Sequence, residues 1–161
     1  MQFTLVPRHL VCVAAVIATL MPPIAAAESE GTPSRVDVLA KYRQECATCH
    51  IAYPRDMLPA ASWQRIVGNL QHHFGTDASL DADSVRQISA WLSETSAGEA
   101  AARAAPPEDR ITRSRWFRQE HAEVPADTWK RPMIRSASNC AACHTRAEQG
   151  NFNEHFIRIP Q

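Results

Sequence analysis

One short pattern occurs twice in this sequence and constrains how the chain can fold. Cysteine, two other residues, cysteine and histidine follow one another at Cys46–His50 and again at Cys140–His144, in a chain of 161 residues. C-x-x-C-H is the attachment signature of c-type haem. Two thiols three positions apart can add to the two vinyl groups of one porphyrin, and the adjacent histidine can then bind the iron from one face.

Other chemistries fit the repeated pattern less well. A zinc knuckle needs two cysteine pairs, or one pair with spaced histidines. A thioredoxin-like redox pair does not need the same histidine twice. The sequence therefore predicts two covalently bound haem c groups. The residues predicted to attach them and to supply the first iron ligands are Cys46, Cys49, His50, Cys140, Cys143 and His144.

The N-terminus has the features of an export signal. Arg8 precedes an apolar run over residues 10–21, and three alanines end at Ala27. We predict a signal peptide over residues 1–27, because the run is too short for a comfortable membrane span. An uncleaved anchor is the weaker alternative. Cleavage removes Cys12 and leaves only the four motif cysteines. The mature chain is then expected in the periplasm, without stable membrane insertion.

Charge is balanced over the whole chain but unevenly distributed. The formal net charge is zero, whereas residues 28–109 are acidic and residues 110–135 are basic. A basic segment can steer a charged partner, and its arginines can equally pair with haem propionates. Both readings stay open. Nucleic-acid binding is not expected.

Apolar spacing predicts mainly helical structure. A helix is expected to run through Tyr42 into the first motif, and loops are expected at the prolines that follow. A second helix, capped by Ser62, is expected to continue to Phe74 and end at Gly75. Further helices are expected after Asp81 or Asp83 and after Ser114. Residues 96–110 have the composition of a linker.

The residues around the motifs resemble the dihaem cytochrome c family. The resemblance is carried by YPRDMLPAASW, HHFG and SLDADSVRQISAWL after the first motif, and by NCAACHTRAEQGNFNEHFIRIP at the end. It implies an N-terminal domain over residues 28–95, similar to class I cytochromes c. A smaller, loop-rich C-terminal haem domain is implied over residues 111–161. It also implies that two histidines hold each haem.

Each iron then needs a second histidine. For the first haem we favour His73, which lies beside the apolar face on a helical wheel and matches the histidine of the family's H-F-G. His72 falls on the opposite face, and Met57 is the alternative ligand. For the second haem we favour His121, because it lies on a predicted helix and its surroundings resemble the family segment. His155, near the chain end, is the alternative.

A fully coordinated iron leaves no position for substrate, so an electron carrier is expected and not an enzyme. The resemblance implies electron transfer from a membrane cytochrome b to a soluble oxygen-binding monohaem cytochrome. The alternative is the small dihaem subunit of a periplasmic nitrate reductase, for which the separation of 94 positions from His50 to His144 is too long. Dihaem peroxidases are usually longer chains, and thiosulfate dehydrogenases typically use a cysteine or methionine ligand. A gas sensor would need a five-coordinate haem.

Overall fold

The computed structural model describes residues 34–94 and 104–161. The predicted signal peptide and residues 96–103 of the predicted linker lie outside this range. Contacts group Thr32–Gln161 into one compact unit. In the described part of the chain, no helix has the length and apolar character needed to cross a membrane.

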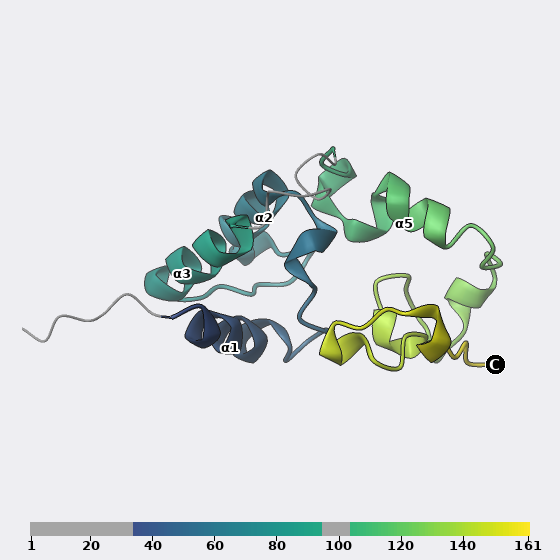
Figure 1. Ribbon diagram of the computed structural model, residues 1–161. Helices are drawn as coiled ribbons and strands as arrows, with labels where there is room; N and C mark the ends of the chain where they lie inside the picture. Colours follow the sequence, from purple (N-terminus) through teal and green to yellow (C-terminus); the bar gives the residue numbers. More distant parts are fainter. Residues whose placement is uncertain (1–33, 95–103) are drawn as a thin grey trace, which may run out of the picture. The chain divides into compact units, whose positions relative to one another are not determined.

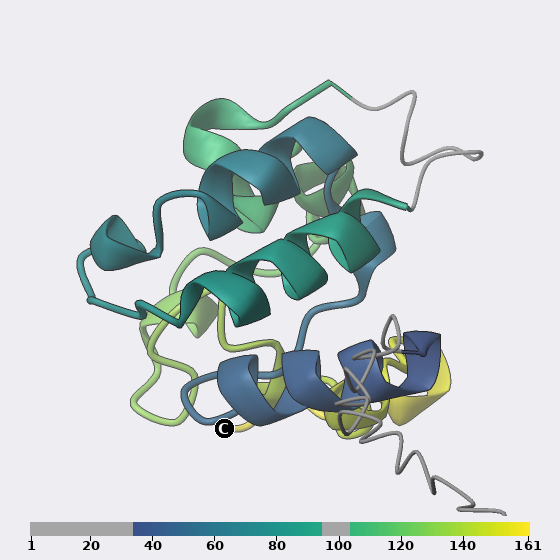
Figure 2. The same cartoon turned by 90° about the vertical axis from the view of Figure 1, so that its left-hand side faces the viewer.

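Three helices build the N-terminal part. They are α1 (Arg35–Cys46), α2 (Ala60–Val67) and α3 (Ala82–Ser93). Figures 1 and 2 show α3 lying between α1 and α2, and α3 contacts both. Apolar side chains from all three helices meet in one core, formed by Tyr42, Leu58, Trp63, Val67, Ile88 and Leu92. These helices therefore form the framework that carries the first motif at the end of α1.

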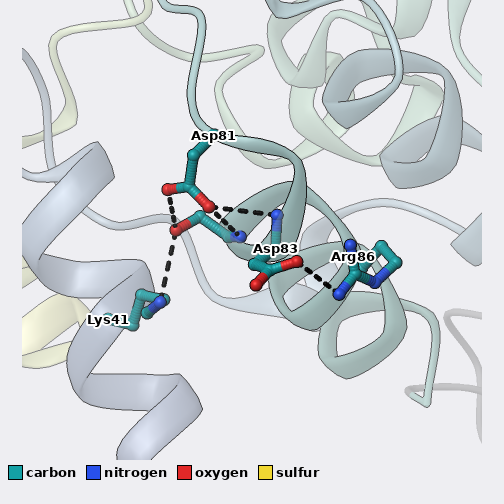
Figure 3. Close-up of polar contacts among 5 residues, drawn as sticks. Lys41, Asp81, Asp83 and Arg86 are labelled. Atoms are coloured by element: carbon teal, nitrogen blue, oxygen red, sulfur yellow. Dashed lines mark hydrogen bonds and ion pairs between the residues drawn. The ribbon is translucent and has the colours of Figure 1, made fainter.

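Polar side chains cap the starts of α1 and α3. Ser34 and Asp37 form a capping box at the start of α1. The Asp81 carboxylate accepts from the backbone N–H groups of Asp83 and Ser84 and caps α3. In Figure 3, Lys41 Nζ donates to the hydroxyl of Ser84, which itself donates to Asp81, so this cap also joins α1 to α3. The ion pair between Asp83 and Arg86 lies on the first turn of the same helix.

The prediction of one helix from Ser62 to Phe74 is wrong. Helix α2 begins after Pro59 and ends at Gly68, where a Cβ atom would lie only 2.9 Å from the Gln64 carbonyl oxygen. Ser62 is not a cap but a fully buried residue inside α2. Beyond Gly68 the chain continues as a 3₁₀ turn over Leu70–His72. The apolar spacing persists through this turn, which is why the sequence resembles one longer helix.

The C-terminal part contains a single α-helix in the described residues, α5 (Arg115–Glu120), which is capped by Ser114 as predicted. The rest consists of short 3₁₀ turns, and the second motif begins one of them at Cys140–Ala142. The described residues form no β-sheet and contain only two isolated β-bridges, His73 with Thr76 and His144 with Ile157. The expectation of a mainly α-helical fold with a loop-rich C-terminal part is confirmed.

Candidate functional site

The first motif follows directly from helix α1. Cys46 is the last residue of α1, and His50 comes one turn later. His50 Nδ1 lies 2.6 Å from the carbonyl oxygen of Ile51. A neutral imidazole that donates from Nδ1 carries its lone pair on Nε2. This hydrogen bond therefore orients the ring and leaves Nε2 as the nitrogen available to a metal.

The structure brings His73 opposite His50. The two ring centroids lie 6.0 Å apart, and the ring planes are inclined by only 28°. His73 is not on a helix. It caps the 3₁₀ turn over Leu70–His72, and Phe74 (φ 53°) and Gly75 (φ 101°) then turn the chain back through the left-handed region. His73 therefore owes its position to a tight turn, while the sequence argument had placed it on a helix face.

The other residues considered near the first motif lie elsewhere. His72 is exposed, and its Nδ1 contacts the Asn69 side chain at 3.0 Å. Met57 ends a 3₁₀ turn and lines a hollow of about 500 Å³ together with Pro59 and Trp116. Of the candidates for a second ligand, His73 is the one whose ring faces His50.

The second motif has its own histidine pair. His121 directly follows the last residue of α5, and its ring centroid lies 6.1 Å from that of His144. These two ring planes are inclined by 71°. His121 Nδ1 lies 2.9 Å from the Phe117 carbonyl oxygen. The His121 ring also stacks on the Phe117 ring, with centroids 4.0 Å apart. Helix α5 therefore positions His121 through both the backbone and the side chain of Phe117.

The chain end holds His144 without supplying a facing histidine. The Arg158 N–H donates to the Cys143 carbonyl at 2.8 Å, and the Thr145 N–H donates to the Phe156 carbonyl at 3.1 Å. His155 immediately precedes the residues that make these contacts but is exposed, with its Nδ1 2.5 Å from Asn153 Oδ1. The terminal segment therefore pairs with the second motif through its backbone, while the His155 side chain is exposed and contacts Asn153.

Both pairs have the dimensions of two histidines on one metal. Imidazoles that bind a metal from opposite sides at about 2.0 Å place their ring centroids roughly 6 Å apart. His73 Nδ1 and His144 Nδ1 are buried without a hydrogen-bond partner. Burial, and secondarily the facing histidine, lowers the pKa of His73 and of His144, which favours the neutral form that binds metals. The residues present fit a haem iron between each pair.

The thiols fit covalent attachment better than a metal cluster. Cys46, Cys49, Cys140 and Cys143 are all unpaired. Burial raises the pKa of Cys46 to about 11 and also raises the pKa of Cys140. Within residues 34–94 and 104–161, no three His, Cys, Asp or Glu side chains converge as metal ligands. A zinc knuckle is therefore not supported in this part of the chain.

Sequence reasoning missed Tyr53. Its ring stacks on His50 with centroids 4.8 Å apart, and its hydroxyl donates to the Ser138 carbonyl at 2.9 Å. Burial, and secondarily the Cys140 thiol, raises the pKa of Tyr53 to about 12. The sequence showed Tyr53 only as part of a loop beside Pro54. A contact with a residue 85 positions away leaves no local pattern.

Comparisons with known proteins show similarity to proteins that carry two haems. The family model for dihaem cytochrome c matches residues 42–152. A dihaem cytochrome c from Shewanella baltica OS155 is 36% identical, with a TM-score of 0.67, and the match covers 76% of this chain and 94% of that one. Two structures of the dihaem cytochrome c from Rhodobacter sphaeroides are both 43% identical, with TM-scores of 0.60 and 0.63. Their matches cover 70% of this chain and 96% and 95% of theirs.

The comparison with curated proteins gives no match. The family match nevertheless spans both motifs and most of the described residues. The three solved structures are covered almost completely and share more than a third of their residues with this chain. The chain therefore belongs to the dihaem cytochrome c family, and its cofactors are two haem c groups.

Proposed function

We propose that the chain is a periplasmic electron-transfer protein with two bis-histidine haems. One haem is attached through Cys46 and Cys49 and held by His50 and His73. The other is attached through Cys140 and Cys143 and held by His144 and His121. The observation that carries this proposal is the ring-centroid separation of 6.0 Å at the first pair and 6.1 Å at the second.

In each pair, one of the two rings is oriented by a backbone carbonyl. At each site one histidine, His50 or His121, donates from Nδ1 to a carbonyl oxygen, which fixes its tautomer and raises its basicity as a ligand. A bound haem supplies one-electron redox chemistry. Two histidines on the iron leave no position for a substrate, which supports a carrier over an enzyme.

For partners, we propose a membrane cytochrome b as the electron donor and a soluble oxygen-binding monohaem cytochrome as the acceptor. The basic segment over residues 110–135 offers two exposed arginines for docking. Arg115 and Arg118 are exposed on α5, the helix that ends at His121, and neither makes an ion pair within the described residues. An acidic surface on the partner would be attracted to this helix. Arg110 differs, because it lies over the Phe74 ring at 4.4 Å.

The test is spectroscopy on the purified protein with both haems attached. We expect low-spin iron at both haems, no His/Met band in near-infrared magnetic circular dichroism, and no carbon monoxide binding by the reduced protein at neutral pH. Mass spectrometry should give the chain from Glu28 plus two haems, with no reactive thiol. A high-spin or carbon monoxide-binding haem in the unmodified protein would contradict the bis-histidine carrier. A mass with residues 1–27 retained would contradict cleavage of the predicted signal peptide.

A further inference from the structure

Tyr53 touches both haem sites. Its ring stacks on His50 at 4.8 Å with the planes 27° apart, so it covers the side of the proposed iron ligand. Its hydroxyl donates at 2.9 Å to the carbonyl oxygen of Ser138, two residues before Cys140. The same carbonyl oxygen lies 3.7 Å from Cys140 Sγ. A continuous line of contacts therefore runs from a ligand of the first haem to an attachment sulfur of the second.

Tyr53 is held firmly on the side of the first motif. The buried hydroxyl of Tyr42, in α1, donates to the Tyr53 carbonyl at 2.9 Å. Pro54, the residue after Tyr53, lies beside Gly150 of the C-terminal segment. A Cβ atom added at Gly150 would be 3.8 Å from Pro54 Cγ. The Tyr53 ring itself packs against the core of the N-terminal helices, whereas the Tyr42 hydrogen bond reaches only the Tyr53 backbone.

The accepting carbonyl is fixed as well. The Ser138 N–H donates to Ser136 Oγ at 3.2 Å, and the two serine hydroxyls are 2.8 Å apart. The Asn139 side chain donates to the Ile134 carbonyl at 3.1 Å, and Ile134 is buried. The turn before the second motif is therefore ordered on its own, and the Tyr53 hydroxyl links two preformed segments.

We propose that Tyr53 is a positioning residue that couples the two haems. It fixes the loop before Cys140 relative to the His50 ring, and it provides a path of protein contacts for electron exchange between them. One electron leaves one iron as the other iron gains it, and Tyr53 keeps its proton throughout. This inference rests on the proposed electron-transfer function.

The test compares three variants with the wild-type protein, all carrying both haems. Tyr53→Phe keeps the stacked ring and removes the hydroxyl, whereas Tyr53→Leu removes both. Tyr42→Phe is the matched control, because it removes a phenol-to-carbonyl hydrogen bond of the same length that does not reach the second motif. The main readout is the rate of electron exchange between the haems in half-reduced protein, measured by nuclear magnetic resonance exchange spectroscopy. A second readout is amide hydrogen exchange in residues 138–143.

We expect Tyr53→Phe to slow electron exchange and Tyr53→Leu to slow it further, while Tyr42→Phe leaves the rate near that of the wild type. Amide exchange before Cys140 should accelerate about fivefold in Tyr53→Phe, the change in an equilibrium that one net hydrogen bond typically produces. Should Tyr53→Leu fail to hold both haems, Tyr53→Phe alone decides.

Unchanged electron exchange in Tyr53→Phe and Tyr53→Leu, with both low-spin signals intact, would overturn the role of Tyr53 and leave the electron-carrier function standing. Equal slowing in Tyr42→Phe would also overturn it, since general loosening of the loop would then account for the effect. A wild-type protein without two bis-histidine haems would overturn both proposals.

Discussion

The two histidine pairs reach the same separation by different structural means. His50 and His73 are held at the edge of a three-helix core, whereas His121 and His144 are held by one short helix and a series of 3₁₀ turns. The ring planes are inclined by 28° in the first pair and by 71° in the second. The separation is what a shared metal requires, while the inclination depends on the surrounding chain.

The two pairs also differ in which histidine, the motif residue or its partner, forms the hydrogen bond to the backbone. In the first pair the motif histidine, His50, donates to a backbone carbonyl, whereas the Nδ1 of its partner His73 is buried without a hydrogen-bond partner. In the second pair the partner, His121, donates, and the Nδ1 of the motif histidine is unpaired. The motif therefore determines which residues attach a haem but not how each ligand is oriented.

The largest expected effect comes from removing the partner histidine of the first pair. His73→Ala should leave one of the two haems high-spin and able to bind carbon monoxide when reduced, because no other ligand candidate faces His50. His72→Ala is the control, since the His72 ring is exposed and contacts Asn69. Carbon monoxide difference spectra of the reduced variants measure this. Binding in His72→Ala but not in His73→Ala would reverse the assignment.

The same experiment at the second pair compares His121 with His155. His121→Ala should expose the second haem to carbon monoxide, while His155→Ala should keep both haems low-spin, because the His155 ring is exposed and contacts Asn153. Electron paramagnetic resonance of the oxidised variants gives the spin states. A high-spin signal in His155→Ala alone would show that the chain terminus supplies the ligand.

The difference in ring inclination predicts two distinguishable low-spin signals in the unmodified protein. Nearly parallel imidazoles interact with one iron π orbital more than with the other and separate their energies, whereas crossed imidazoles keep these orbitals close in energy. We therefore expect a rhombic resonance from the first haem and a strongly anisotropic one from the second. His73→Ala should remove the former and His121→Ala the latter. Two identical resonances would contradict the distinction between the pairs.

A smaller effect is expected from the helix caps. Ser114 caps α5 by accepting from the Phe117 N–H at 3.1 Å, and Phe117 also positions His121. Ser114→Ala should lower the free energy of unfolding by about 1 kcal/mol and disturb the resonance of the second haem. Ser34→Ala, at the start of α1, should leave that resonance unchanged. Denaturant unfolding followed by haem absorbance measures both variants, and equal disturbance by both would argue against separate support of the two sites.

The smallest effect concerns an acid-sensitive ion pair. The Arg65 guanidinium on α2 donates to Asp109 at 2.8 Å and 2.6 Å and is the main cause that lowers the pKa of Asp109 below its ordinary value of 3.8. A carboxyl with a lowered folded-state pKa adds stability above its unfolded pKa, and this contribution is lost as the pH falls through the folded value.

Asp109→Asn should therefore lower the melting temperature slightly near neutral pH and converge with the wild type in acid. Asp83→Asn, which removes an exposed ion pair within α3, is the control and should change the melting temperature less at neutral pH. Melting temperatures measured from neutral pH to below 3.8 separate the two variants. Parallel curves for Asp109→Asn and the wild type would contradict the assigned role of this pair.

The sequence predicted those features that depend on neighbouring residues, namely helix caps and the fold class. Caps such as Asp81 and Ser114 have direct signals, because one side chain satisfies nearby backbone groups, and the fold class followed from apolar spacing. The path of the chain from Gly68 to Gly75 could not be predicted in this way. The apolar spacing continues through that segment, and the left-handed conformation of Phe74 has no sequence signal. The contact of Tyr53 with Ser138 depends on tertiary packing, to which local patterns are insensitive.

The sparse packing of the C-terminal part has a consequence for biogenesis. Among residues 104–161, the buried apolar core side chains are few, namely Phe117, Ile134 and Ala147, and the turns are short. So small a core leaves a chain marginally stable without a further apolar body, and the porphyrin of the second haem provides one. Maturation and folding of this half should therefore be a single event. A chain that has received only its first haem would present an open C-terminal tail to proteases, so incompletely matured molecules would be degraded before they could act as defective carriers.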